Sequence, residues 1–188
     1  EAFANDKVTP TNSNAYDILL YDNNRDIDWQ KELIGKTANF SNAQLSLSGG
    51  NTLNQYNIGA IYNKQTTVFP GDFSDVKKGL NFNINTSSAN SNFTMLLSGS
   101  YLIDSSKLPG TDLTSFIFLP PNAPDMVNPD GTLNYTNNPT NYVSSLRRSF
   151  GRTVNNLVGN ATLSYQPLPG LQIKTSLGYS NIQVTETV

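Results

Sequence analysis

Apolar and polar residues alternate with period two along six stretches of this chain, and almost no charged residue falls inside them. Between residues 92 and 101, apolar residues or glycine at odd positions alternate with Thr94, Ser98 and Ser100, and Leu96 is the one exception. Successive side chains of a β-strand point to opposite faces, so the pattern predicts strands with one apolar and one hydrogen-bonding face. The predicted strands cover 40–49, 55–63, 78–86, 92–101, 154–165 and 171–180.

The connections between the predicted strands alternate between short and long. Short turns rich in Gly, Asn, Ser or Pro are expected at 50–54, 87–91 and 166–170. By contrast, 102–152 is a connection of roughly fifty residues, and loops of that length are usually functional or disordered. None of the ten prolines is expected inside a strand, because proline cannot donate to a sheet ladder. This rhythm predicts an all-β fold, an antiparallel up-and-down meander of six strands.

Residues 1–39 lack the alternation and are expected to be irregular apart from one short helix. Asp28 can accept hydrogen bonds from the first backbone N–H groups of a helix over 29–34. Gly35 can end that helix, because glycine is favoured where a helix stops. The region is therefore predicted to be a long loop that contains one short, capped helix.

The composition narrows the possible chemistry. The chain has 188 residues, of which 37% are hydrophobic but only 14% charged, against roughly 25% charged in soluble domains. Its formal net charge of −2 offers no basic surface for neutralising phosphates, so nucleic acid is not an expected partner. The absence of His and Cys excludes Ser-His-Asp triads, cysteine nucleophiles and imidazole zinc sites within this chain. We therefore expect no enzyme activity and no cofactor.

Acidic residues suggest two further chemistries, and neither is favoured. Acidic or amide residues at alternate positions from Asp22 to Asp28 have the spacing of the first ligands of a calcium loop, but Ile27 and Leu33 stand where that loop needs glycine and glutamate. The carboxylates of the long connection could form a glycosidase pair, yet turn chemistry in a solvated loop explains them more simply. No metal site and no catalytic residue is predicted.

The lengths and faces of the strands suit a membrane wall. A strand crosses a bilayer with ~9–11 residues, and in outer-membrane barrels apolar side chains face lipid, polar ones face a wet lumen, and turns are short on the periplasmic side. Lys174, the one charged residue in the strand cores, falls on the polar face. Tyrosines of the apolar faces would then form a girdle at each interface. The lower girdle would hold Tyr56 and Tyr165, and the upper one Tyr62, Tyr101 and Tyr179.

A soluble β-sandwich-like carbohydrate-binding module is the alternative, because its strands also alternate. Soluble exposed strands usually carry charge that blocks edge pairing, whereas the polar faces here carry Asn, Ser, Gln and Thr. Six strands cannot close a membrane barrel, whose smallest examples have ~8 strands. We therefore expect the chain to be part of a larger object, with residues 1–39 as an extracellular loop and residues 40–188 as a partial barrel.

Several segments resemble the barrel of SusC/RagA-type TonB-dependent transporters in their residues, order and spacing. The similarity spans roughly residues 14 to 182, and order and spacing carry more of it than any one piece. The segments are 28–32 (DWQKE), 45–51 (LSLSGGN), 56–62 (YNIGAIY), 72–73 (DF), 119–124 (LPPNAP), 128–131 (NPDG), 165–167 (YQP) and 170–171 (GL).

The resemblance implies a location in the bacterial outer membrane and a barrel of about 22 strands with a plugged lumen. Such transporters import oligosaccharides or peptides with energy from TonB, usually under a SusD-like lipoprotein lid. The expected partners are the rest of the barrel and its plug domain, the lipoprotein, TonB through the N-terminal part that this sequence lacks, the lipid bilayer and the solute. This chain would supply about six strands and the loops between them.

Two sets of residues are candidates for contact with the solute or a partner. Aromatic rings in the long connection can stack on sugars, grip peptides or pack against a partner, or they can simply fold the loop on itself. These rings are Phe116, Phe118, Tyr135 and Tyr142. Polar residues of the predicted lumen side could line a solute path, although ladders between strands or packing on a plug are favoured. They are Asn81, Asn83, Asn85, Asn156, Asn160, Gln172 and Ser176.

Overall fold

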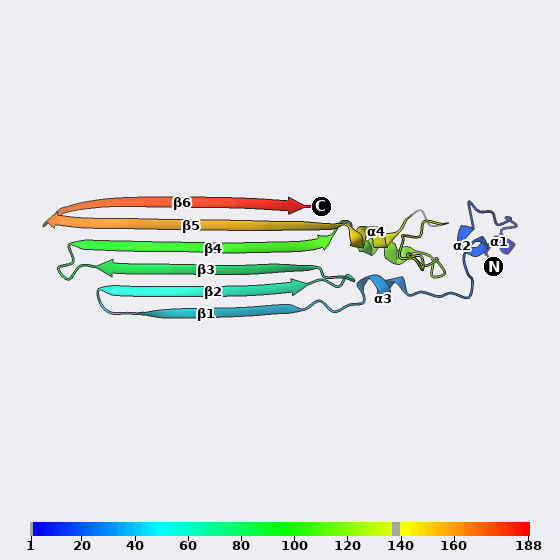
Figure 1. Cartoon of the computed structure of the whole chain (residues 1–188), viewed down its shortest axis with the longest axis horizontal. Coiled ribbons are helices and arrows are strands. Elements are labelled where there is room, and N and C mark those ends of the chain that lie inside the picture. Colours follow the sequence, from blue (N-terminus) through cyan, green and yellow to red (C-terminus); the bar gives the residue numbers. More distant parts are fainter. Residues whose placement is uncertain (1, 137–139) are drawn as a thin grey trace.

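The computed structural model of the chain describes residues 2–136 and 140–188. Six strands form one antiparallel sheet in the order of the sequence, so every strand pairs with its neighbours in the chain (Figure 1). The strands are β1 (Phe40–Gly50), β2 (Asn54–Thr66), β3 (Ser74–Ser87), β4 (Phe93–Pro109), β5 (Ser149–Leu168) and β6 (Leu171–Thr187). The all-β meander predicted from the alternation is confirmed, and the sheet is open, with β1 and β6 at its edges.

The helices are short and lie at one end of the sheet, beyond the long connections (Figure 1). They are α1 (Ala2–Asn5), α2 (Tyr16–Leu19), α3 (Trp29–Ile34), the 3-10 helix η1 (Leu113–Phe118) and α4 (Tyr142–Arg147). The predicted helix is α3, in which the Asp28 side chain accepts a 3.0 Å hydrogen bond from Lys31 N and Gly35 ends the helix. Within residues 2–136 and 140–188, no helix is long and apolar enough to cross a membrane.

Every strand except β1 is longer at the loop end than the alternation predicts. The pairing of β4 with β5 continues to Pro109 opposite Ser149, so the long connection covers 110–148 rather than 102–152. The prediction stopped early because Leu102 places an apolar side chain on the polar face and charged residues follow. Backbone hydrogen bonds do not depend on side-chain polarity, and the ladder therefore runs on past the point where the pattern fades.

Two prolines lie in strands, so the prediction that none would is wrong. Pro109 is the last residue of β4, where the ladder ends. Pro167 lies within β5 at a register shift between Tyr165 and Leu168. A bulge leaves a residue out of the regular pairing, so a missing N–H group at this position costs no ladder hydrogen bond.

Each face of the sheet has a distinct chemistry. Cross-strand partners share a face, and the row Leu45, Ala60, Leu80, Tyr101, Leu157 runs across five strands on what we name the apolar face. The side chains of this face are uncovered: Leu45 is 73% and Leu80 60% exposed. No second sheet lies against it in the described part of the chain, so the sandwich architecture is not present there. The opposite face, which we name the polar face, carries mostly Asn, Ser, Gln and Thr.

Tyrosines of the apolar face lie on an oblique line across the sheet. The register makes Tyr62 on β2 level with Ile103 on β4, so Tyr101 lies two residues nearer the short turns. Tyr101 is in turn level with Asn181 on β6, and Tyr179 lies two residues nearer again. The line therefore steps by one residue per strand. With ~3.4 Å per residue and ~4.8 Å between strands, its slope is about 35°.

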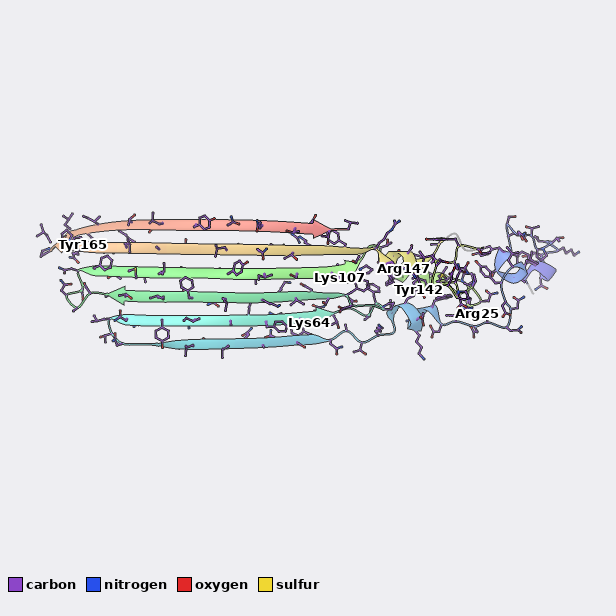
Figure 2. The ribbon with its side chains drawn as sticks, viewed as in Figure 1. Arg25, Lys64, Lys107, Tyr142, Arg147 and Tyr165 are labelled. Carbon is purple, nitrogen blue, oxygen red and sulfur yellow. The ribbon has the colours of Figure 1, made fainter. Side chains whose placement is uncertain are left out.

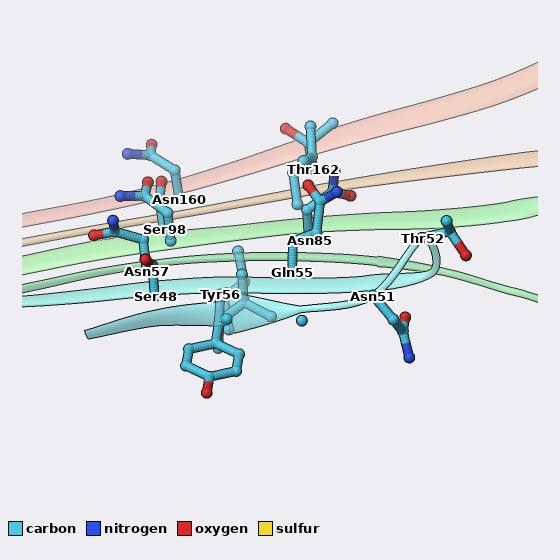
Figure 3. A pocket seen from close by; sticks show the side chains of 16 residues that line it. Ser48, Asn51, Thr52, Gln55, Tyr56, Asn57, Asn85, Ser98, Asn160 and Thr162 are labelled. Atoms are coloured by element: carbon cyan, nitrogen blue, oxygen red, sulfur yellow. The ribbon is translucent and has the colours of Figure 1, made fainter.

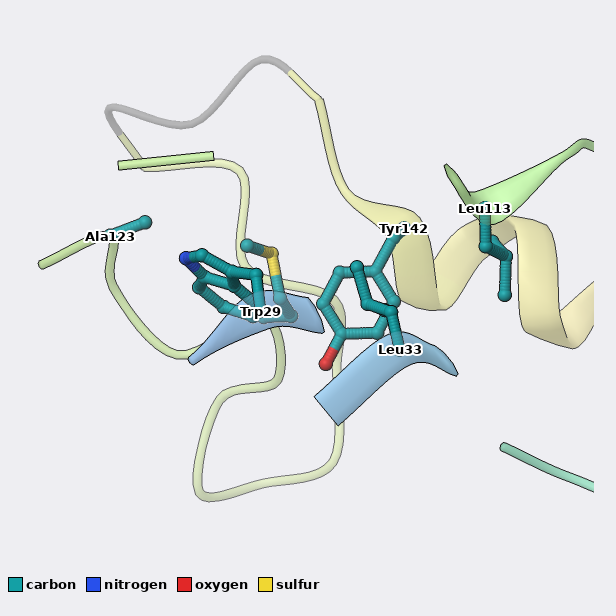
Figure 4. Close-up of a cluster of buried hydrophobic side chains, with 6 residues drawn as sticks. Trp29, Leu33, Leu113, Ala123 and Tyr142 are labelled. Atoms are coloured by element: carbon teal, nitrogen blue, oxygen red, sulfur yellow. The ribbon is translucent and has the colours of Figure 1, made fainter. Parts of the chain in front are cut away.

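The hydrophobic core lies beyond the sheet, among the loops. We name it the cap cluster, and Figure 4 shows its close packing. It consists of Trp29, Leu33, Leu113, Ala123, Met126 and Tyr142. The cluster joins α3 to the connection between β4 and β5, so two segments far apart in the sequence form one small cap. The sheet itself therefore reaches the cap at one end and has both faces free.

Candidate functional site

Hydrogen bonds to main-chain carbonyl groups hold the N-terminal segment onto the long connection. Trp29 Nε1 donates to Pro120 O at 2.8 Å, and Ile27 N donates to Pro121 O at the same distance. Pro120 O also accepts from Ala123 N at 2.9 Å, so the turn that carries this carbonyl is itself closed by a hydrogen bond. The capped start of α3 thus presents the indole to a proline-rich turn of the cap.

The four aromatic candidates divide into one buried ring, one partly buried ring and two exposed rings. Tyr142 is 7% exposed, meets Trp29 edge to face at 5.7 Å, and is joined by Phe116 at 6.2 Å. Phe116 and Tyr142 therefore fold the loop on itself. Phe118 is 85% and Tyr135 53% exposed, and these two rings are the ones free to contact a solute or partner.

Burial and charge act together on the Tyr142 hydroxyl. Burial raises the pKa of Tyr142, and the nearby carboxylates of Glu32 and Asp125 raise it further, because the phenolate would be desolvated and repelled. The neutral phenol is thus the form that the cap accommodates.

An ion pair spans the seam between the two segments of the cap. Arg25 Nη2 bonds Asp125 Oδ1, and this bond holds the pKa of the Asp125 carboxyl below its usual range. A hollow of about 530 Å³ lies beside the pair, lined by residues of both segments. Its amides already have partners within the cap: Asn134 Nδ2, for example, donates to Asp125 O at 2.8 Å. The groups that the hollow offers to a ligand are therefore mainly the charged side chains of Arg25 and Asp125. Arg25 and Tyr142 are labelled among the side chains of Figure 2.

Asn141 organises the cap in a way that the sequence analysis missed. It is 4% exposed, and its Nδ2 donates to Met126 O at 2.6 Å and to Asn134 O at 2.9 Å. Its Oδ1 accepts from Val143 N at 3.0 Å, which caps α4. An Asn directly before a short helical run is the signal that could have found it.

The acidic residues of the cap serve turns and helix caps. Asp28 caps α3, and Asp22 Oδ1 accepts from Asn24 N at 2.9 Å. Asp130 accepts from the hydroxyl and the backbone N–H of Thr132, which lowers the pKa of the Asp130 carboxyl. Among residues 2–136 and 140–188, no group of three acidic side chains is placed to hold a metal ion. The calcium spacing near residue 22 is therefore not matched by a ligand cage.

Neutral side chains line a concave part of the polar face near the short turns, which we name the amide surface. It encloses about 950 Å³ and contains no charged residue. Asn57, Asn85 and Asn160 point to one side of the sheet there, and the Tyr56 ring points to the other (Figure 3). Asn85 Oδ1 is shielded from solvent and has no hydrogen-bond partner in the described chain.

Some amides outside this surface pair, as the ladder interpretation expects, but Asn156 Oδ1 has no hydrogen-bond partner in the described chain. Asn42 Nδ2 donates to Asn63 Oδ1 at 2.8 Å, and Gln172 Nε2 donates to Ser164 Oγ at 2.7 Å. The predicted lumen-side residues thus form ladders in some places and leave free carboxamides in others. Asn83, Asn85 and Asn160 lie on the amide surface, where a hydrogen-bonding solute or another part of the protein could meet them.

Charged residues of the strands are segregated by face. The polar face holds both signs, and most of them pair: Lys77 lies 3.1 Å from Asp75 and 3.7 Å from Asp104, and Arg152 lies 3.6 Å from Glu186. The apolar face holds lysines alone, all at the loop end. They are Lys64, Lys78 and Lys107, and Figure 2 shows the first and last of these at that end, with Tyr165 at the opposite one.

No protein-family model matches the sequence, and no curated protein matches it either.

Proposed function

We propose that this chain is part of the wall of a transmembrane β-barrel in the bacterial outer membrane, in a TonB-dependent importer of the SusC/RagA type. In this role the chain does no chemistry. The strands separate lipid from a solute path, and the loops of the cap contact the solute or a partner. The observation that carries the proposal is the uncovered apolar face with its oblique line of tyrosines.

The slope of the tyrosine line supports a tilted wall. Strands of outer-membrane barrels tilt by ~35–45° from the barrel axis. A girdle that is level with the membrane must therefore cross the strands obliquely, by about one residue per strand. Tyr62, Tyr101 and Tyr179 follow that slope. A sheet in water has no interface to impose such a slope on its tyrosines.

The height of the apolar band also suits a membrane. On β4 the odd-numbered side chains from Phe93 to Ile103 lie on the apolar face, and Ser105 and Lys107 follow. This stretch spans ten steps, or ~34 Å along the strand, and about 28 Å after a tilt of 35°. Apolar bands of outer-membrane barrels are ~25 Å tall.

The two edges of the sheet leave room for the rest of a barrel. β1 and β6 each pair on one side only, and long unpaired edges are a hazard unless they are covered or paired. The remaining strands would close the wall and the plug would fill the lumen. TonB would act through the N-terminal part, and a SusD-like lipoprotein would meet the cap. An oligosaccharide or peptide would pass the polar face, where the amide surface offers neutral hydrogen-bonding groups.

The soluble carbohydrate-binding alternative has no comparable support. It would need a partner to cover the apolar face, since large exposed apolar patches mark interaction sites or membrane contact. No observation in the described residues favours sugar over other ligands at the cap.

Cell fractionation tests the proposal. The full-length protein is expressed in its outer-membrane host, and membranes are washed with plain buffer and then with high salt. We expect the protein to stay in the membrane until detergent is added, and protease added to intact cells to cut within 110–136 but not within the short turns. Release into buffer without detergent would contradict the membrane assignment.

A further inference from the structure

Two lysines stand side by side on the apolar face, just beyond the tyrosine line. Lys78 on β3 is directly opposite Tyr62, and Lys64 on β2 is directly opposite Val76. Lys64 and Lys78 are therefore diagonal neighbours, and side chains in that relation are separated by ~7–8 Å at their roots, within reach of long side chains.

Nothing in the described chain neutralises these two charges. Neither lysine forms an ion pair with a described residue, whereas Lys77, the neighbour of Lys78 on the opposite face, has two carboxylates around it. All acidic residues of the strands lie on the polar face. Adjacent like charges on a sheet repel one another. An anion from outside the chain that binds both ammonium groups would relieve this repulsion.

We propose that Lys64 and Lys78 hold the anionic, phosphate-bearing headgroup of a membrane lipid. This inference rests on the proposed membrane wall, in which residues just beyond the tyrosines lie at headgroup level. Lysine stems can lie along apolar surface while their ammonium groups reach the polar layer. Leu80 adjoins Lys78 on the same face and is 60% exposed, so an acyl chain has a surface directly below the two charges. That continuity favours a lipid over a free phosphate ion.

A label beside the pair can report which lipids gather there. The full-length protein carries Leu80→Cys, modified with a small fluorophore, in vesicles of phosphatidylcholine with a minority of phosphatidylglycerol. Bromine atoms on the acyl chains of one lipid or the other then quench the label. We expect phosphatidylglycerol to quench more than its share of the vesicle predicts, and high salt to weaken the excess.

Substitutions distinguish the effect of this lysine pair from the effect of positive charge elsewhere on the sheet. Lys64→Gln with Lys78→Gln should lower the excess by roughly five- to twenty-fivefold, since one lysine near an anionic surface is worth about fivefold. Lys77→Gln with Lys174→Gln removes the same charge from the polar face, and should leave the excess unchanged. An equal loss in both double variants would overturn the proposal.

The outcomes also distinguish this inference from the membrane proposal. Quenching by phosphatidylglycerol in proportion to its share of the vesicle would leave the wall in place and refute the headgroup site. No quenching by either lipid would refute the wall itself. Inorganic phosphate, at the ionic strength of a chloride control, should not displace the lipid. If it abolished the excess where chloride does not, a free anion rather than a lipid would be the ligand.

Discussion

The ring of Trp29 meets the ring of Tyr142 edge to face, with 5.7 Å between their centroids and 74° between their planes. One ring comes from the segment before β1 and the other from the connection between β4 and β5. This contact, with the bond from the indole to Pro120 O, joins loops that emerge from strands three positions apart in the sheet. The cap therefore ties the outer ends of the strands together.

Removing the indole should open the cap without disturbing the sheet. Trp29→Ala should destabilise the cap by ~3–5 kcal/mol, as expected for a buried aromatic side chain. Trp29→Phe keeps a ring but loses the bond to Pro120, and should cost only about 1 kcal/mol. Limited proteolysis of the 110–148 connection, with β-sheet circular dichroism as the control, measures both effects. A cap that resists protease equally in all three proteins would contradict this role.

Alkaline pH should loosen the same cluster through Tyr142. Its pKa is raised in the fold above the ordinary tyrosine value of about 10, because burial and two nearby carboxylates disfavour the phenolate. The stabilising effect is therefore complete below about pH 10 and is lost as the pH rises through the folded-state pKa. Ultraviolet absorbance of ionised tyrosine, followed with cap proteolysis, should show the two changes together. Tyr142→Phe should remove the alkaline step; a step that persists in this variant would assign it to another group.

The Arg25–Asp125 pair should contribute far less than Trp29 to the stability of the cap. Asp125 is largely exposed, and pairs of this kind contribute ~0.2–1 kcal/mol and weaken with salt. The pKa of Asp125 is depressed in the fold, so the contribution is present above about pH 4 and is lost as the pH falls through the lower, folded-state value. Arg25→Gln and Asp125→Asn should each give a small, salt-dependent shift in cap stability. A loss as large as that of Trp29→Ala would refute this ranking.

Two glycines opposite each other offer a matched test of packing on the apolar face. Gly99 and Gly159 are cross-strand partners on β4 and β5. A Cβ atom at Gly99 would lie 2.7 Å from the Phe82 ring, whereas one at Gly159 would meet nothing within 4 Å. Gly99→Val should therefore cost ~1–3 kcal/mol by overpacking. Gly159→Val should be tolerated, and thermal unfolding of the folded protein in detergent compares the two. Equal destabilisation would show that Phe82 does not rest on Gly99.

The strands and their order could be predicted because period-two alternation records which face each side chain takes. Tyr62 and Lys174 were assigned to the correct faces from parity alone. The same pattern failed beyond Leu102, where both faces carry mixed residues at the loop end while the backbone ladder continues. Where the end of a strand depends on backbone pairing alone, the sequence of side chains holds no pattern that would predict it.

The cap could be predicted only in part. Asp28 and Gly35 marked α3 by local chemistry, and the structure confirms both ends. The partnership of Trp29 with Tyr142 has no local signal, because it depends on a contact between segments more than a hundred residues apart. Four aromatic residues looked equivalent in the sequence, yet burial separates Tyr142 from Phe118.

The membrane wall is tested most directly by labels on neighbouring residues of one strand. Single cysteines at Leu80 and Asn81 on β3, and at Leu157 and Asn156 on β5, carry a fluorophore in the full-length protein in vesicles with brominated lipids. We predict strong quenching at Leu80 and Leu157, and weak quenching at Asn81 and Asn156, because successive side chains face lipid and lumen in turn. Equal quenching at all four positions, or quenching on the polar face alone, would contradict the account.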